Sequence, residues 1–261
     1  RLHHTADYMT FEDTEKLGKF ISFMEKEVKR RRQMLAQAMV QHFEVYNRTG
    51  CGVMKTIVSL RDHYDVVREL GQETEDFFQK LSRDGSGLGI FLIVTATRSA
   101  AMKYGTYNNF KNKIAGYLFE ANETAGIVGR SDLKPSEKKG RTLVKWKGNV
   151  NAMQTAVMAA CKEEEEYNKG IETLIRDINS LYPGEKAVRI AVLPEKLNRH
   201  SLMEYEGSCR IRLGLHTETV QAAGLEGSFA PFAILGDPKR GKTTVVKVIL
   251  SQLSGAEKIW L

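Results

Sequence analysis

This chain lacks long apolar segments and closely spaced cysteines, and both absences narrow its class. No apolar run reaches the ~18–20 residues of a membrane-spanning helix, and no stretch has the pattern of a signal peptide. The three cysteines, Cys51, Cys161 and Cys209, lie far apart, without the spacing of metal ligands. We therefore expect neither a membrane-spanning fold nor a disulfide framework, and we interpret the cysteines as reduced thiols of a cytoplasmic protein.

Length, composition and charge set broad limits. The chain has 261 residues, which suits one large domain or two smaller ones, and 42% of them are hydrophobic, enough to form a core. Its formal net charge is +7. That charge permits an anionic partner, such as nucleic acid, a membrane surface or an acidic protein, but selects none of them.

Residues 236–243, GDPKRGKT, match the pattern G-x-x-x-x-G-K-T of a phosphate-binding P-loop. An apolar run at 232–235 predicts a buried strand before the loop, and 243–250 predict a helix after it. Backbone amides at the start of that helix would then face a phosphate chain, Lys242 would reach the β and γ phosphates, and the Thr243 hydroxyl would bind Mg²⁺. The alternative is a chance glycine turn before a helix. We predict ATP and Mg²⁺ as cofactors, with these binding residues: Gly236, Arg240, Gly241, Lys242, Thr243 and Thr244.

The loop departs from the usual pattern in its middle. Pro238 has no N–H, and Lys239 and Arg240 stand where P-loops usually carry small residues. The proline precedes the main phosphate-binding amides, so binding is retained, whereas the two cations either attract phosphate or obstruct the loop. The sequence begins abruptly at Arg1 and stops within an apolar strand pattern at 258–261, so we expect both of its ends to be cut. Only 18 residues follow Thr243, so we also expect the P-loop module to be incomplete in this chain.

Strand and helix patterns alternate along the chain, which predicts an α/β fold with a mostly parallel sheet flanked by helices. The predicted helices cover 10–46, with a capping-box-like start at Thr10 and Asp13, then 64–82, 162–181 and 243–250. The predicted strands cover 57–60, 90–94, 114–119, the flanks of Gly140 and Gly148, 188–193, 210–215, 217–222, 232–235 and 258–261.

Two charge runs fall within the predicted helices. The basic run Lys29–Arg32 is interpreted as a solvated helix face, and the alternative is a contact with an anionic strand or a neighbouring subunit. The acidic run Glu163–Glu166 suits the positive end of a helix dipole, and Pro183-Gly184 stops that helix.

Asp62 follows the predicted strand 57–60, in the position of a Walker B carboxylate that holds the Mg²⁺ shell. We therefore predict Asp62 and Thr243 as metal-binding residues, although an ordinary strand-end aspartate is an equal alternative. Hydrolytic enzymes of this type usually place a glutamate next, but His63 stands there, and Asp65 lies on a different phase of the chain.

The strand 90–94 runs into two threonines, Thr95 and Thr97, where such enzymes sense the γ-phosphate. We predict Thr97 as a catalytic residue together with Asp62. The alternative is that these hydroxyls only cap the strand.

Three segments together resemble FtsK/SpoIIIE-type ATPases, which are RecA-like P-loop NTPases. Residues 93–98, IVTATR, resemble a strand ending in Ala-Thr-(Gln)-Arg-Pro; 108–115 resemble Asn-x-Phe/Pro-x-Arg-Ile-Ala; and 127–134, followed by Gly140-Arg141, resemble Ile-x-Gly-Arg-x-Asp…Gly-Arg-Gly. Within this family, 129–133 and 151–156 look most like the EssC (YukB/EccC-like) group of type VII secretion ATPases.

The resemblance covers nearly the whole chain and implies parts of two tandem modules, the second and third ATPases of that group. The acidic helix and residues 192–197 look like the junction between them. We expect 1–160 to be the C-terminal part of one module, 161–190 a linker helix and turn, and 191–261 the N-terminal part of the next module.

The same resemblance implies a protein secretion motor on the cytoplasmic side of the cell membrane, anchored by parts of a parent protein outside this chain. Its implied substrates are small helical secreted proteins of the WXG type, and its implied partners are other copies of itself and other subunits of the secretion complex. Arg98, Lys111, Lys113 or Arg130 would then reach a neighbour's nucleotide, although a solvated charge is the favoured reading of each.

His63 and the residues 238–240 leave ATP hydrolysis open. Two alternatives therefore remain: a DNA translocase of the FtsK/SpoIIIE kind, and a docking module that binds nucleotide without hydrolysing it. The +7 charge and Lys29–Arg32 suit the translocase. The degenerate Walker B region argues against it, so nucleic acid is not the expected partner.

Overall fold

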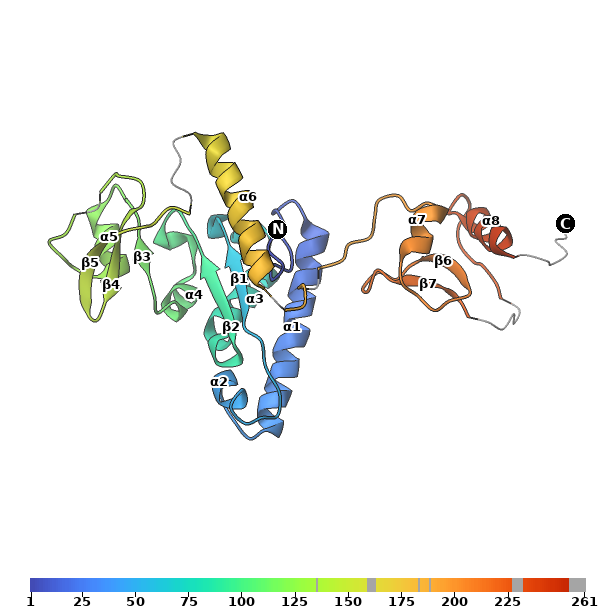
Figure 1. The fold of residues 1–261 in the computed structure, drawn as a ribbon, viewed down its shortest axis with the longest axis horizontal. Coiled ribbons are helices and arrows are strands. Elements are labelled where there is room, and N and C mark those ends of the chain that lie inside the picture. The colour runs from blue at the N-terminus through green and yellow to red at the C-terminus, as the bar shows by residue number, and fades with distance from the viewer. Residues whose placement is uncertain (135, 159–162, 183, 188, 227–231, 254–261) are drawn as a thin grey trace. The chain divides into compact units, whose positions relative to one another are not determined.

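The computed structural model describes residues 1–134, 136–158, 163–182, 184–187, 189–226 and 232–253. The chain divides into two compact units, 1–187 and 188–261, which are described separately below. Figure 1 shows the helices and strands along the chain. The predicted strand at 258–261 lies outside the described residues. Among the residues described, no helix is both long enough and apolar enough to cross a membrane.

The first unit is built around two parallel strands, β1 (Ile57–Arg61) and β2 (Ile90–Val94), which pair in register from end to end. Between them the chain passes through η1 (Tyr64–Arg68), α3 (Gln72–Asp84) and η2 (Ser86–Leu88). Helices α1 (Thr14–Gln37) and α2 (Phe43–Tyr46) precede the strands. The core cluster comprises Met24, Leu35, Tyr46, Met54, Tyr64, Val67, Phe77, Phe78, Leu81, Leu88 and Ile90.

The predicted helix over 10–46 is too long at both ends. Helix α1 begins after Asp13, whose carboxylate accepts hydrogen bonds from the Thr10 amide at 2.9 Å and hydroxyl at 3.1 Å. It ends because Met39 adopts a left-handed conformation, φ +54°, and the Val40 amide donates back to the Leu35 carbonyl. This turn closes the helix as a Schellman-type cap does. The predicted helix over 64–82 is likewise two elements, η1 and α3, separated at Gly71, φ +97°.

Within the basic run of α1, Lys29, Arg30 and Arg32 are exposed, as the prediction of a solvated face expects, but Arg31 is only 2% exposed. Its guanidinium donates to the carbonyls of Leu88 and Lys55, at 2.7 Å each, and to Glu27 at 2.7 Å. Helix spacing turns one residue of any four toward the core, and a buried charge must be fully hydrogen-bonded. Both readings of the run are therefore wrong for this residue, which ties α1 to the loops before β1 and β2.

A second sheet follows in the first unit, after η3 (Ser99–Ala101) and α4 (Tyr104–Asn109). It is antiparallel, with the order β3 (Ile114–Ala115), β4 (Arg141–Trp146), β5 (Asn149–Gln154), and one face packs on α5 (Ala121–Val128). The predicted strand over 114–119 therefore keeps only two residues. Strands β4 and β5 are joined by a two-residue turn, Lys147-Gly148, with φ values of +50° and +86°. Positive φ at both central residues is the type I′ geometry, which matches the twist of a hairpin.

Helix α6 (Glu164–Leu181) closes the first unit and agrees with the prediction of a helix over 162–181 within the described residues. Its Asn179 side chain accepts from the His3 amide at 2.7 Å and donates to the Arg1 carbonyl at 3.0 Å. These bonds join the start of the chain to the last turn of α6.

The second unit contains α7 (Arg199–Glu204), an antiparallel pair β6 (Ile211–Leu215) and β7 (Ala222–Leu225), and α8 (Lys242–Gln252). The Gln252 side chain fastens α8 to β6, because its amide exchanges bonds of 2.9 and 2.8 Å with the backbone N–H and C=O of Arg212. The Arg212 guanidinium in turn donates to carbonyls at 202, 203, 205 and 207.

Three strand predictions in the second unit are wrong within the described residues. Residues 189–193 and 232–235 form no strand, and 217–221 form a turn that leads into β7. A strand requires a hydrogen-bonded neighbour, and the described sheet here consists of β6 and β7 alone. Apolar sequence therefore predicted strands in this unit correctly only where a partner strand lies beside it.

Candidate nucleotide-binding site

The carboxyl ends of β1 and β2 meet at one edge of the parallel pair, since Arg61 pairs with Val94. The next residues, Asp62 and Thr95, therefore face each other, and the Thr95 hydroxyl donates to Asp62 Oδ1. The same hydroxyl accepts from the His63 amide at 3.1 Å. Thr95 thus fixes both the predicted Walker B aspartate and the turn that follows it.

A second aspartate–threonine pair lies beside the first and was missed by sequence reasoning. Asp65 accepts from the Thr97 amide at 3.0 Å and from the Thr97 hydroxyl at 2.5 Å. The chain reaches this arrangement because His63 is left-handed, φ +50°, and reverses the backbone between the two aspartates. Thr97 is therefore paired with Asp65, whereas Asp62 pairs with Thr95. The three-residue spacing of Asp62 and Asp65 is the signal that could have indicated a shared turn.

Both aspartates are stabilised as carboxylates. The hydrogen bond from Thr95 lowers the pKa of the exposed Asp62. Burial acts to raise the pKa of Asp65, but hydrogen bonds from the hydroxyl and amide of Thr97, with smaller contributions from its own backbone and Arg98, lower it overall. The second oxygen of Asp62, Oδ2, lies 3.9 Å from His63 Nε2. This oxygen fits a role in the hydration shell of Mg²⁺, but within the described residues no group of three or more His, Cys, Asp or Glu could enclose an ion.

The P-loop of the second unit is folded around its own lysine. Lys242 Nζ donates to the carbonyls of Gly236 at 2.6 Å and Asp237 at 2.8 Å. Lys239 and Gly241 both have positive φ, +61° and +86°, which curl the loop ahead of α8. In the described part of the chain no side chain caps the first turn of α8. The free amides of that turn and the lysine therefore lie together at a helix N-terminus, which favours an anion.

The predicted site residues fall in two places. Gly236, Lys242 and the start of α8 form one loop in the second unit, whereas Asp62 and Thr97 lie in the first unit. The structure therefore describes a P-loop in the second unit and a pair of carboxylates in the first unit, each as a separate feature. The assignments of Asp62 and of Thr243 as metal-binding residues, each in its own module, stay predictions.

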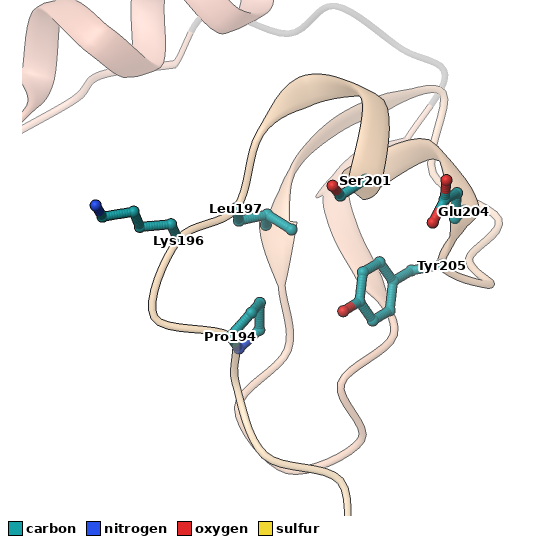
Figure 2. Close-up of a pocket in the computed structure, with 6 residues that line it drawn as sticks. All are labelled: Pro194, Lys196, Leu197, Ser201, Glu204 and Tyr205. Atoms are coloured by element: carbon teal, nitrogen blue, oxygen red, sulfur yellow. The ribbon is translucent and has the colours of Figure 1, made fainter.

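A separate pocket of about 400 Å³ opens in the second unit beside α7. Figure 2 shows Leu197 and the Tyr205 ring facing its interior, while Lys196 points away. Its lining residues are Pro194, Lys196, Leu197, Ser201, Glu204 and Tyr205. None belongs to the P-loop, so this pocket is not the nucleotide site that the motif predicts.

Comparison with known proteins identifies the relatives of this chain, although no protein-family model matches it. It is 31% identical over 259 residues to the ESX secretion system protein EccC of Geobacillus thermodenitrificans, and 30% identical over 264 residues to YukB of Bacillus subtilis. Each match covers 97% of this chain but only 17% of the relative. The chain thus spans about a sixth of the length of these relatives.

Solved structures give the same picture. The structure of EssC (ATPases 2 and 3) from Geobacillus thermodenitrificans matches with a TM-score of 0.82 and 30% identity, over 97% of this chain and 49% of that one. The cytoplasmic domain of EssC matches with a TM-score of 0.69 and 28% identity, over 96% and 50% of the two chains.

The fold is therefore that of the RecA-like P-loop ATPase modules of type VII secretion, which confirms the α/β class predicted from the sequence. More particularly, this chain is a homologue of EssC, EccC and YukB and resembles the part of them that contains ATPases 2 and 3. The boundaries that the sequence predicts for the modules, at 160 and 190, stay predictions.

Proposed function

We propose that this chain is a cytoplasmic part of a type VII secretion ATPase, and that its second unit binds ATP with Mg²⁺ through the loop 236–243. The observation that carries the proposal is the lysine at the loop. Lys242 is held by two backbone carbonyls, at an uncapped helix N-terminus among the described residues. When ATP binds, Lys242 can donate to charged phosphate oxygens instead of these neutral carbonyls. Hydrogen bonds to ionised acceptors are about twice as strong as those to neutral ones.

Each residue of the loop has a defined part in this proposal. Lys242 would bind the β and γ phosphates, and the amides from Arg240 to Thr244 would bind along the phosphate chain. The Thr243 hydroxyl, in the first turn of α8, would hold Mg²⁺, which supplies charge neutralisation when bound. Arg240 is exposed and adds a second cation at the mouth of the loop.

In the first unit we propose a weakly hydrolytic or non-hydrolytic site around Asp62. The residue after this carboxylate is a left-handed histidine rather than a glutamate, so no carboxylate in that position activates water. The nearby Asp65 is bound on both oxygens by Thr97, which leaves it poorly placed to accept a proton.

Binding of secreted proteins is part of the proposal. An EccC from Thermomonospora curvata (ATPases 2 and 3), solved in complex with a signal sequence peptide, matches with a TM-score of 0.57 at 17% identity, which shows a shared fold alone. The named relatives are secretion-system proteins, which supports a secreted substrate for this chain. We propose small helical proteins of the WXG type as that substrate and further subunits of the secretion complex as partners.

The test is titration calorimetry of the 261-residue chain with Mg²⁺–ATP. We expect saturable binding that Lys242→Ala abolishes. Lys247→Ala is the matched control, because Lys247 is exposed on the same helix and has no ion pair in the described structure. Circular dichroism checks that both variants are folded. Equal ATP affinity in the original protein and Lys242→Ala would overturn the assignment of the loop.

A further inference from the structure

The positive charge of this chain is concentrated in one stretch. Residues 98–154 contain 11 of the 39 Lys and Arg residues but only 4 of the 32 Asp and Glu residues. The net charge of this stretch is +7, equal to that of the whole chain, so the remaining residues are neutral in sum. The stretch contains the antiparallel sheet β3–β4–β5.

Strand register gathers four lysines at one end of this sheet, the end where β4 turns into β5. In β4, Val144 pairs with Ile114, the first residue of β3. The next residue of β4, Lys145, therefore lies opposite Lys113, the residue just before β3. Lys147 is in the hairpin turn, and Lys111 precedes Lys113 by two residues. We call these four lysines, with Trp146 between two of them, the lysine hairpin.

The lysine hairpin is not neutralised within the described structure. None of its four lysines has an ion pair there, whereas Arg30, Arg31 and Arg32 of α1 all do. Lys113 lies 4.3 Å from the centre of the Tyr107 ring, a contact that leaves its charge in place. Unpaired like charges held close together repel one another, so they favour an external anion.

An apolar face accompanies the charges. Trp146 is 64% exposed, Ile114 59% and Met153 36%, and the pairing places all three on one face of the sheet with Val144. The opposite face is the one that packs on α5, through Leu143. The polar residues Thr142, Asn149 and Asn151 share this face, so its exposed apolar side chains stand among polar ones, with Trp146 next to the hairpin turn.

The turn adds a further observation. Lys147 has φ +50°, in the first central position of a type I′ turn, where asparagine, aspartate or glycine is preferred. The lysine is therefore held in a strained conformation that projects its charge beyond the strands.

We propose that the lysine hairpin docks on the anionic headgroups of a lipid bilayer, with Trp146 at the headgroup level. Trp is enriched at the membrane–water interface, and lysines near an anionic surface are attracted to it. The charged residues of this tip are all lysine, which acts as a point charge and suits mobile headgroups, whereas fixed phosphates in nucleic acid favour the fork of arginine.

Two other anionic partners fit the hairpin less well. Single-stranded nucleic acid stacks its bases on several aromatic rings along a groove, whereas here Trp146 stands among Ile114, Val144 and Met153, and the Tyr107 ring is in contact with Lys113. An acidic protein helix docks in an apolar groove, and the described pocket lies elsewhere, in the second unit. An exposed tryptophan flanked in the sequence by Lys145 and Lys147 matches an interfacial anchor.

The experiment uses the 261-residue chain with Trp260→Phe, so that Trp146 is the only remaining tryptophan of two. Vesicles of phosphatidylglycerol mixed with phosphatidylcholine are compared with vesicles of phosphatidylcholine alone. We expect co-sedimentation and a blue shift of Trp146 emission with the anionic vesicles, both weakened by salt. Absence of binding to anionic vesicles at low salt would overturn the proposal.

Matched charge reversals locate the contact. Lys145→Glu/Lys147→Glu should weaken vesicle binding about 25-fold or more, because each lysine near an anionic surface contributes about a fivefold factor. Lys29→Glu/Lys80→Glu makes the same charge change at exposed helix positions and should leave most of the binding intact. Equal loss in both variants would show general attraction to net charge and overturn the proposal. A single-stranded DNA oligonucleotide is the third probe, and binding to it without binding to vesicles would also overturn the proposal.

Discussion

The two units hold their candidate site residues in different ways. In the first unit the carboxylates stand on a parallel strand pair above a cluster of eleven buried residues. In the second unit the P-loop precedes α8, whose one buried residue is Ile249 among those described. The first site is bound together by hydrogen bonds between its own side chains, whereas the P-loop is bound by contacts of one lysine with its backbone.

The difference predicts a rigid carboxylate site in the first unit and a P-loop in the second unit that binds a ligand more easily. A carboxylate that already has its hydrogen bonds is pre-organised, and a ligand must compete with them. A lysine bound to neutral carbonyls loses little when phosphate replaces them. We therefore expect the first unit to dominate the stability of the chain and the second unit to respond more strongly to nucleotide.

The largest expected effect concerns the stability of the first unit. Arg31→Ala should lower the free energy of unfolding by about 3–5 kcal/mol, because Glu27 and the loop carbonyls would lose a buried charged partner. Urea unfolding followed by circular dichroism measures the change. Lys29→Ala, on an exposed position of the same helix, should stay within about 0.5 kcal/mol. Similar losses in the two variants would mean that the run acts only as helix surface.

A smaller effect is expected in the second unit. Gln252→Ala removes the two bonds that fasten α8 to β6, and should cost about 1–3 kcal/mol as the strand groups lose their partners. Lys247→Ala is the control on the same helix. Amide hydrogen exchange of α8 reports the change locally, so faster exchange throughout the first unit as well would contradict a separate second unit.

The smallest effect concerns the two aspartates. Thr95→Val should raise the pKa of Asp62, and Thr97→Val that of Asp65, as read from carboxyl NMR shifts. A carboxyl whose pKa is lowered by folding stabilises the protein above its unfolded pKa, about 3.9 for aspartate. That stabilisation is lost as the pH falls through the pKa of the folded protein. Both variants should therefore be less stable than the original protein only at pH values above that folded pKa.

Thr56→Val is the control for this series, because Thr56 is exposed and precedes β1. It should leave both carboxyl titrations unchanged. An unaltered pKa of Asp65 in Thr97→Val would show that the short contact between the two side chains does not stabilise the carboxylate.

Local patterns predicted the parts of the fold that local interactions determine. The strands at 57 and 90, the helix after the P-loop and the helix ending at Leu181 were all found close to their expected bounds. The parallel pairing of β1 with β2 agrees with the predicted sheet, while the other two described sheets are antiparallel. Pairing direction depends on which strands meet, and spacing along the sequence carries little information about it.

The residues that sequence reasoning missed depend on contacts between distant segments. Arg31 resembles its neighbours in the basic run, and only carbonyls 24 to 58 residues later distinguish it. Asp65 joins the candidate site because His63 adopts a left-handed conformation, for which histidine gives only a weak signal. The assignment of the P-loop residues and of Asp62 to nucleotide chemistry still depends on the experiments above.

Arg31 also constrains the order in which the first unit can form. Its guanidinium donates to the carbonyls of Lys55 and Leu88, which are available only once the loops that contain them are in place. If α1 packed earlier, the Arg31 charge would be buried without these acceptors, at a cost in free energy. Helix α1 can therefore settle only as the chain on either side of β1 and β2 comes together. We expect helix and strand pair to open and close as a single cooperative folding unit, with matching protection of their amides from exchange.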